Sequence, residues 1–207
     1  INVTNKVLLF QPGVFLVSDT LAGRDTSGEP QCYMTLQGSG TSATTVLLHD
    51  MAAGFGDAAD PKPVVYTASC KDATSYAPGD GENGFKNGIF DLTIDVGRDN
   101  PGAVALDFLG NNKASIARVK MIGRAGSGVV GLSLVRRYVG PMLVKSLTVE
   151  GFAVGVNVSN PQCSVTMVDI NLTAQTFAGI VNSRNIVSVE KLWSEQASSN
   201  VPAVLLT

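Results

Sequence analysis

Residues 89–94 read IFDLTI, and the same kind of segment returns as IARVKM at 116–121, VKSLTV at 144–149, VTMVDI at 165–170 and VEKLW at 189–193. Apolar and polar residues alternate in these segments, which is the period-two pattern of a β-strand with one buried face. Their central apolar positions are spaced by 27, 28, 21 and 24 residues, at Leu92, Val119, Leu147, Val168 and Leu192. A repeat of this length is typical of a solenoid.

A second series of strand-like segments lies between the first. It reads VALDF at 104–108, VGLSL at 130–134, VGVNV at 154–158, AGIV at 178–181 and AVLL at 203–206. Both series advance by about 25 residues. The sequence therefore predicts an all-β fold, a right-handed parallel β-helix with two or more strands per coil, in which stacked coils bury a continuous apolar column. A propeller blade would need about 40–45 residues.

The remaining sequence fits one β-helix region over residues 1–207, with regular coils in 89–207 and irregular early coils in 1–88. Strands are expected near 7–16, 33–37 and 46–49, followed by a long loop at about 51–88 that is rich in Gly, Asp, Ala and Pro. Solenoids need caps at their ends, and no cap is recognisable here. We therefore expect the chain to be part of a longer protein.

Composition excludes several classes of protein. Hydrophobic residues make up 44% of the chain and charged residues 15%, which argues against disorder. The net charge of −2 lacks the basic excess of a nucleic-acid-binding protein. No apolar stretch reaches the ~18 residues of a membrane helix. Neither nucleic acid nor membrane insertion is expected.

Several motifs resemble the pectate-lyase-like β-helix superfamily, which is related to glycoside hydrolase families twenty-eight and fifty-five. They are VLLFQPGVFLVSDTL at 7–21, LTIDVG at 92–97, NPGAV at 100–104, Gly140-Pro141 and VEGF at 149–152. The resemblance implies the β-helix fold and a polysaccharide partner. The Gly-Asp-Gly-x-x-Asp-Asp-Thr segment and capping helix with which the family usually begins are absent, as is the Asp-Asp constellation of polygalacturonases, so no family catalytic residue maps onto this chain.

Outward strand positions supply the candidate site residues. The alignment above places Asp95, Ile122, Glu150, Asn171 and Glu195 in one outward column and Thr93, Lys120, Thr148, Asp169 and Trp193 in the next. Two coils separate Glu150 from Glu195, roughly 9–10 Å, near the upper end of the ~6.5–9.5 Å used for inverting glycoside hydrolysis. Glu150, Asp169 and Glu195 are thus catalytic candidates, and Trp193, Lys120 and Arg118 are candidate sugar-binding residues. Alternatively, these side chains only keep the solenoid solvated.

Cysteines and sequons bear on the compartment. Cys32 and Cys70 flank one irregular region and can pair, leaving Cys163 over; three buried thiols are the alternative. Asn2, Asn157 and Asn171 each begin a glycosylation sequon. With few Lys and Arg, these features favour an extracellular or cell-surface protein. A glycan on Asn171 would block the candidate catalytic face.

The other motifs give weaker evidence of a functional site. His49 is the only histidine, so a His/Cys metal site lacks ligands, and no metal or cofactor is expected. An acidic run suggests calcium binding, but no ligand set is defined by its residues, which are Asp80, Asp91, Asp95 and Asp99. Residues 126–131, GSGVVG, match a dinucleotide fingerprint, but a strand follows them instead of a helix. The Arg136-Arg137 pair can hold a uronate carboxylate or lie at a plain surface turn.

Two hypotheses remain. In the first, the chain is a secreted, carbohydrate-active β-helix, a hydrolase or lyase acting on or binding an extracellular polysaccharide. In the second, it is a non-catalytic structural or adhesive element of a cell surface, filament or sheath, which assembles with other copies of itself.

Overall fold

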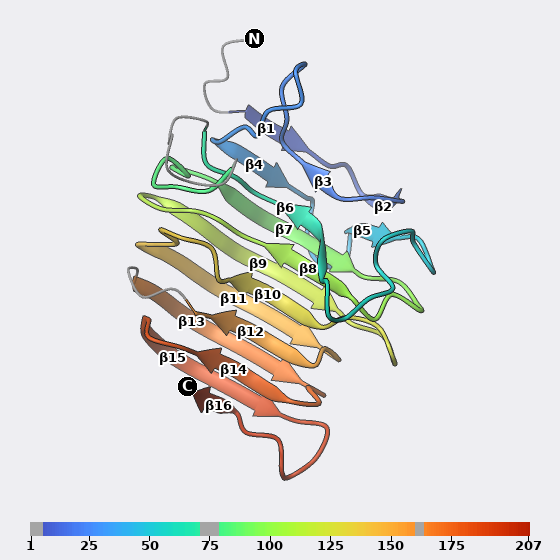
Figure 1. Cartoon of the computed structure of the whole chain (residues 1–207), viewed down its shortest axis with the longest axis vertical. Helices are drawn as coiled ribbons and strands as arrows, with labels where there is room; N and C mark the ends of the chain where they lie inside the picture. The colour runs from blue at the N-terminus through green and yellow to red at the C-terminus, as the bar shows by residue number, and fades with distance from the viewer. Residues whose placement is uncertain (1–5, 71–78, 160–163) are drawn as a thin grey trace.

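The computed structural model describes residues 6–70, 79–159 and 164–207, which form two parallel sheets (Figure 1). The long sheet contains β1 (Lys6–Leu9), β2 (Gly13–Val17), β4 (Met34–Gln37), β5 (Thr44–Leu48), β7 (Gly88–Asp95), β9 (Ala114–Ile122), β11 (Met142–Glu150), β13 (Ser164–Thr173) and β15 (Ile186–Glu195). The short sheet contains β3 (Leu21–Ala22), β6 (Lys62–Tyr66), β8 (Ala103–Asp107), β10 (Val130–Leu134), β12 (Val154–Val158), β14 (Ala178–Asn182) and β16 (Val204–Leu206). The described residues contain no helix that is long and apolar enough to span a membrane.

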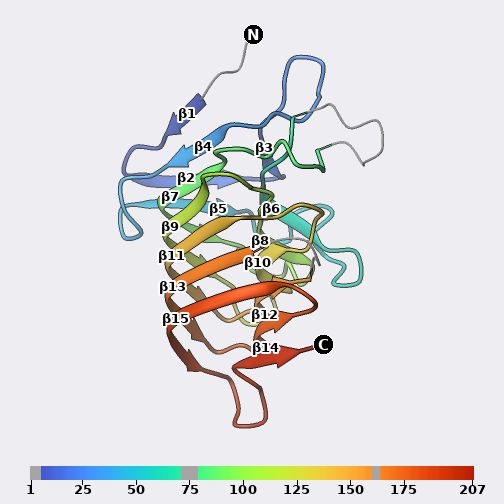
Figure 2. The same ribbon diagram turned by 90° about the vertical axis from the view of Figure 1, so that its left-hand side faces the viewer.

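From β7 onward the chain alternates between the two sheets, one strand in each per coil. In the long sheet the register runs from Leu92 through Val119, Leu147 and Ile170 to Leu192, so a coil advances by 22 to 28 residues. The short sheet advances by 24 or 26 residues, for example from Val104 to Val130 and Val154. The two views show that the coil descends with a right-handed turn (Figures 1 and 2). The predicted fold class, an all-β right-handed parallel β-helix, is confirmed.

The core consists of apolar columns that run along the helix axis. Ile89, Ile116, Val144 and Met167 stack in one column of the long sheet, and all four are buried. Leu106, Leu132, Val156 and Ile180 form a facing column of the short sheet. Each coil covers the inward side chains of its neighbour, because a single coil has too little apolar surface to bury them alone.

Strands β7, β9, β11, β13 and β15 each contain one residue with positive φ, and these residues occupy one column. They are Asp91, Arg118, Ser146, Asp169 and Lys191, with φ between 52° and 60°. Cα pairing skips this column, whereas the residues on both sides of it pair across all five strands. We call it the bend column. A non-glycine residue in this conformation is uncommon, so its recurrence at the same position marks a shared break in the pleat.

Residues 51–88 do not form the single long loop that their composition predicts. Strand β6 lies in this stretch and pairs with β3 and β8, which makes it part of the short sheet. Its sequence KPVVY starts with two residues that disfavour strands, but Val64 and Val65 are fully buried. Burial against the core therefore outweighs the intrinsic preference of Lys and Pro for other structure.

Candidate functional site

The outer side of the long sheet, beyond the bend column, carries most of the predicted site residues. Strand register places Thr93, Lys120, Thr148, Asn171 and Trp193 in one outward column. The neighbouring outward column consists of Asp95, Ile122, Glu150, Thr173 and Glu195. We call these two columns the ladder face. Within it, Trp193 is 64% exposed.

The structure corrects the predicted position of Asp169. Sequence alignment had put Val168 in the inward column and Asp169 beside Trp193, but Ile170 is the inward residue of β13 and pairs with Leu147 and Leu192. Asp169 therefore lies in the bend column, where it accepts a hydrogen bond from Ser146 Oγ at 2.9 Å. Thr173 occupies the place between Glu150 and Glu195. A catalytic group made of all three carboxylates does not form.

Positively charged side chains at the ladder face are held by carboxylates. Lys120 Nζ lies 3.1 Å from Glu150 Oε2. At the edge of the face, Arg124 donates to both carboxylate oxygens of the buried Asp95. This second pair borders a hollow of about 600 Å³, whose lining includes Ile122 and Glu150. The ladder face is thus a surface of compensated charge with one hollow at its edge.

Arg118 belongs to the bend column and does not reach into the ladder face as a free cation. It donates to both oxygens of Asp91, with Nη2 at 2.8 Å from Oδ2. Gln37 also donates to Asp91 Oδ2, at 2.7 Å. The Arg118 guanidinium, helped by Gln37, holds the pKa of the Asp91 carboxyl below its usual value. The sugar-binding role predicted for Arg118 would require it to leave this bidentate pair.

The three predicted glycosylation sites have different surroundings. Asn171 is exposed at the centre of the ladder face. Asn157 lies in β12 of the short sheet, half-buried between Ser133 and Val181. Asn2 lies outside the described residues, as does Cys163.

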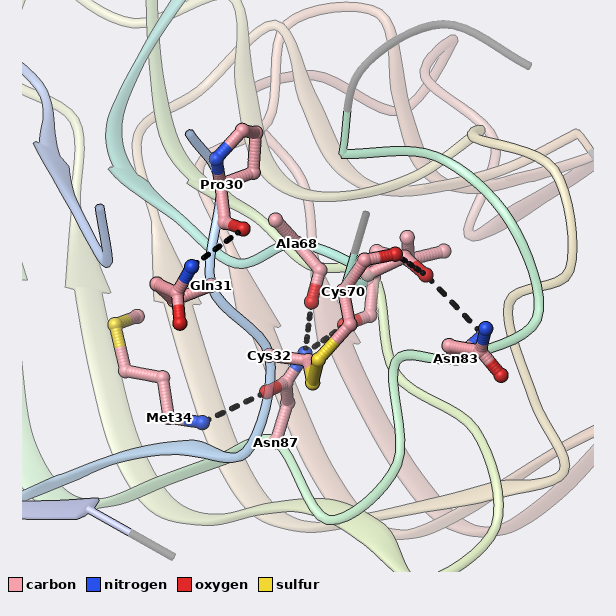
Figure 3. The surroundings of a disulfide bond; sticks show 10 residues. Pro30, Gln31, Cys32, Met34, Ala68, Cys70, Asn83 and Asn87 are labelled. Carbon is pink, nitrogen blue, oxygen red and sulfur yellow. Dashed lines mark hydrogen bonds between the residues drawn. A yellow bond between two sulfur atoms is a disulfide. The ribbon is translucent and has the colours of Figure 1, made fainter. Parts of the chain in front are cut away.

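Cys32 and Cys70 are joined by a disulfide, with a Cα–Cα distance of 4.7 Å (Figure 3). The bond links the segment before β4 to the segment after β6. Beside it, the Asn87 amide donates to the carbonyls of Ala68 and Leu109 and accepts from Met34 N. The side chain of Asn87 therefore ties three segments together next to the disulfide.

A charged cluster that could not be predicted from sequence lies on the outer side of the short sheet. Asp107 Oδ1 accepts from Arg136 Nε at 3.0 Å, and Asp80 Oδ1 lies 3.7 Å from Arg136 Nη1. The Arg136 guanidinium also donates to the carbonyls of Thr67 and Asp107 and lies 4.2 Å from the centre of the Tyr66 ring. The side chains of Arg136 and Asp107 are only 11% and 18% exposed.

Burial has the largest effect on the Asp107 carboxyl and raises its pKa, although the Arg136 charge acts in the opposite direction. A carboxyl perturbed by burial beside a specific charged partner is a common feature of functional sites, but structural ion pairs show it as well. Here Arg136 binds groups from three segments, which indicates a structural clamp. Its position within the Arg136-Arg137 pair was visible in the sequence, but its partners, 29 to 69 residues away, were not.

The remaining motifs do not build a site. His49 is exposed, and its Nδ1 lies 2.6 Å from the Asp50 carbonyl. Residues 126–131 form the turn into β10, with Gly126 and Gly128 at positive φ. The acidic run separates, since Asp91 and Asp95 pair with different arginines while Asp80 lies near Arg136. Among the described residues, no group of three or more His, Cys, Asp or Glu side chains is placed to hold a metal ion.

Comparison with known proteins gives matches among solved structures only. No protein-family model matches the chain, and no curated protein matches it. A pectin methylesterase in complex with a hexasaccharide has a TM-score of 0.47 and 14% identity, over 91% of this chain and 58% of that protein. The A-module of mannuronan C-5 epimerase AlgE4 from Azotobacter vinelandii has a TM-score of 0.44 and 16% identity, over 87% and 52%. ORF18 of Geobacillus virus E2 has a TM-score of 0.42 and 10% identity, over 96% of this chain and 52% of that protein.

The chain spans little more than half the length of these proteins. The strand register of this chain shows the parallel sheets of a β-helix without any of these comparisons.

Proposed function

We propose that the chain binds a polysaccharide along the ladder face. The observation that carries this proposal is the exposed indole of Trp193 at the end of a column that continues through Asn171, Thr148 and Lys120. An exposed aromatic ring offers an apolar face on which the C–H side of a sugar ring can stack. The polar side chains of the column offer hydrogen bonds to sugar hydroxyl groups.

The spacing of the face suits a polymer. Equivalent side chains repeat about every 4.8 Å along a parallel sheet, which is close to the length of one pyranose unit in an extended chain. Solenoids generally provide extended binding surfaces because each repeat adds one more element to them. A polysaccharide lying along the helix axis would therefore meet one side chain of each column at every coil.

An extracellular or cell-surface location is part of the proposal. Support comes from the Cys32–Cys70 disulfide, because such bonds persist mainly in oxidising compartments. A glycan on Asn171 would stand between Thr148 and Trp193 and occupy the ladder face. Protein from its natural source should consequently carry no sugar at Asn171, which peptide mass mapping of this sequon before and after glycosidase treatment checks.

Hydrolysis is a second candidate, favoured by the pair Glu150 and Glu195. Strand register places them in one column two coils apart, about 9–10 Å by the strand spacing. That is near the upper end of the separation of the two carboxyl groups in inverting glycosidases, ~6.5–9.5 Å. The Glu195→Gln variant should abolish release of reducing ends if this pair acts, and should leave binding within about threefold of the unmodified chain.

Binding is tested by affinity electrophoresis and calorimetry with a panel of soluble polysaccharides. We expect Trp193→Ala to weaken binding at least tenfold, about 1.4 kcal/mol. Phe177→Ala is the matched control, because Phe177 is 57% exposed but lies in the turn between β13 and β14, away from the ladder face. Equal binding by the Trp193 variant and the unmodified chain would refute the proposal. If no polysaccharide binds at all, the structural or adhesive hypothesis takes its place.

A further inference from the structure

We infer that the ladder face takes an uncharged polysaccharide rather than a polyuronate, and that Glu150 sets this preference by holding Lys120 in an ion pair. This inference rests on the proposed function and concerns the chemical class of the ligand. Lys120 was expected from sequence to meet an acidic sugar. The contacts of the face point the other way.

The charges within the ladder face are unequal in number. Among its described residues, Lys120 is the one cation, whereas Asp95, Glu150 and Glu195 are carboxylates. Lys120 is paired with Glu150 at 3.1 Å, and Asp95 is held by Arg124 from outside the face. Glu195 is left as an uncompensated negative charge in the column next to Trp193, among the residues that the structure describes.

Two arginines at the border of the face are held by carboxylates, whereas the exposed Arg98 lines the hollow beside Glu150. Arg118, in the bend column beside Lys120, makes two hydrogen bonds to Asp91. Arg124 makes two to Asp95. Lys191 and Asp169 occupy the bend column in adjacent coils. The Asp169 carboxylate is therefore the neighbour of Lys191 in that column.

A uronate and a neutral sugar would meet this face differently. A uronate can reach Lys120 beside Glu150 or by displacing it, because the partly exposed ammonium group has three N–H donors. Exposed ion pairs contribute little to stability, so displacement is easy, but in either case the Glu150 carboxylate stays next to the uronate, and Glu195 lies further along the same column. A neutral sugar leaves the ion pairs intact, stacks on Trp193 and bonds to the Asn171 amide and the Thr148 and Thr173 hydroxyls.

The test compares soluble β-glucan and galactomannan with polygalacturonate and alginate at low ionic strength. The unmodified chain should bind at least one neutral polymer at least tenfold more tightly than either polyuronate. The Glu150→Gln variant should bind polyuronate at least tenfold more tightly than the unmodified chain, because Lys120 is freed. That gain should disappear near 1 M salt, where the screening length is only about 3 Å.

Glu190→Gln is the matched control, because it removes the same charge from β15 at an exposed position outside the ladder face. An equal gain in both variants would overturn the role of Glu150. If Trp193→Ala weakens binding but the unmodified chain prefers polyuronate, the inference fails and the proposed function stands. If Trp193→Ala has no effect on any polymer, the proposed function itself fails.

Discussion

At the scale of single residues, the bend column shows what side-chain identity does and does not reveal. Asp91, Arg118, Ser146, Asp169 and Lys191 share a left-handed backbone conformation and little else. Asp accepts this conformation more readily than most residues, but Arg and Lys carry no such signal. The polar contacts along the column, Arg118 with Asp91 and Ser146 with Asp169, help to hold it. Position in the coil, not composition, sets the bend.

Asp107 should make stability depend on pH in a direction opposite to that of most paired carboxyls. Its raised pKa means that the folded chain favours the protonated form, so the contribution of Asp107 is greatest below the ordinary Asp pKa of about 3.9 and is lost as pH rises through the raised value. The free energy of unfolding of the unmodified chain should therefore fall relative to that of Asp107→Asn as pH rises above about 4. Urea denaturation across this range measures it.

Asp91→Asn is the control, because the pKa of Asp91 is lowered by Arg118. Its contribution is present above about pH 4 and is lost as pH falls toward the lowered value. As pH rises, the unmodified chain should thus lose stability relative to Asp107→Asn and gain stability relative to Asp91→Asn. Parallel curves for both would contradict the assignment of Asp107 as a carboxyl dominated by burial.

At the scale of elements, alternation identified both strand series but not every register. In each regular strand the bend leaves two residues between the inward pair, such as Ile89 and Leu92 in β7, and the predicted central residues of β7, β9 and β11 were right. In β13 the inward pair is Met167 and Ile170, but Val168 between them is also apolar. Aligning Val168 with the central apolar residues of the other strands therefore gave the wrong register. The site residues on β13 were shifted for the same reason, while Glu150, Trp193 and Glu195 lay on strands whose alignment was correct.

The register of β13 can be tested by truncation. Ile170 is 1% exposed, so Ile170→Ala should leave a cavity and lower the free energy of unfolding by about 2–5 kcal/mol. Val168 points outward in the column of Lys145 and Glu190 and is half-buried. Val168→Ala should cost less than about 1 kcal/mol, since few buried contacts are lost. Chemical denaturation of both variants checks this, and a larger loss from Val168→Ala than from Ile170→Ala would restore the register predicted from the aligned segments.

At the scale of the whole molecule, the two ends of the solenoid are built differently. The regular coils from β7 onward depend on contacts with the coil before and the coil after, as expected for a quasi-one-dimensional fold. The early strands are shorter and less regular, and β1, β2, β4 and β5 share the long sheet as separate pieces. Their connections are fixed by long-range bonds that no sequence period could predict, such as Asn87 with Ala68 and Met34.

The Cys32–Cys70 disulfide should stabilise these early coils and leave the later ones unaffected. It closes a loop across 38 residues, for which loss of chain entropy in the unfolded state predicts about 4 kcal/mol. Because repeats in a solenoid interact mainly with their neighbours, the Cys32→Ser/Cys70→Ser variant should lose hydrogen-exchange protection in β4 and β6 by up to about a thousandfold. Protection in β11 and β13 should stay within about threefold. Treating the unmodified chain with a reductant should reproduce the variant, and the variant itself should not respond to reductant. An equal loss of protection in β6 and β13 would mean that the solenoid unfolds as one cooperative unit, with the disulfide stabilising the whole molecule rather than its early coils.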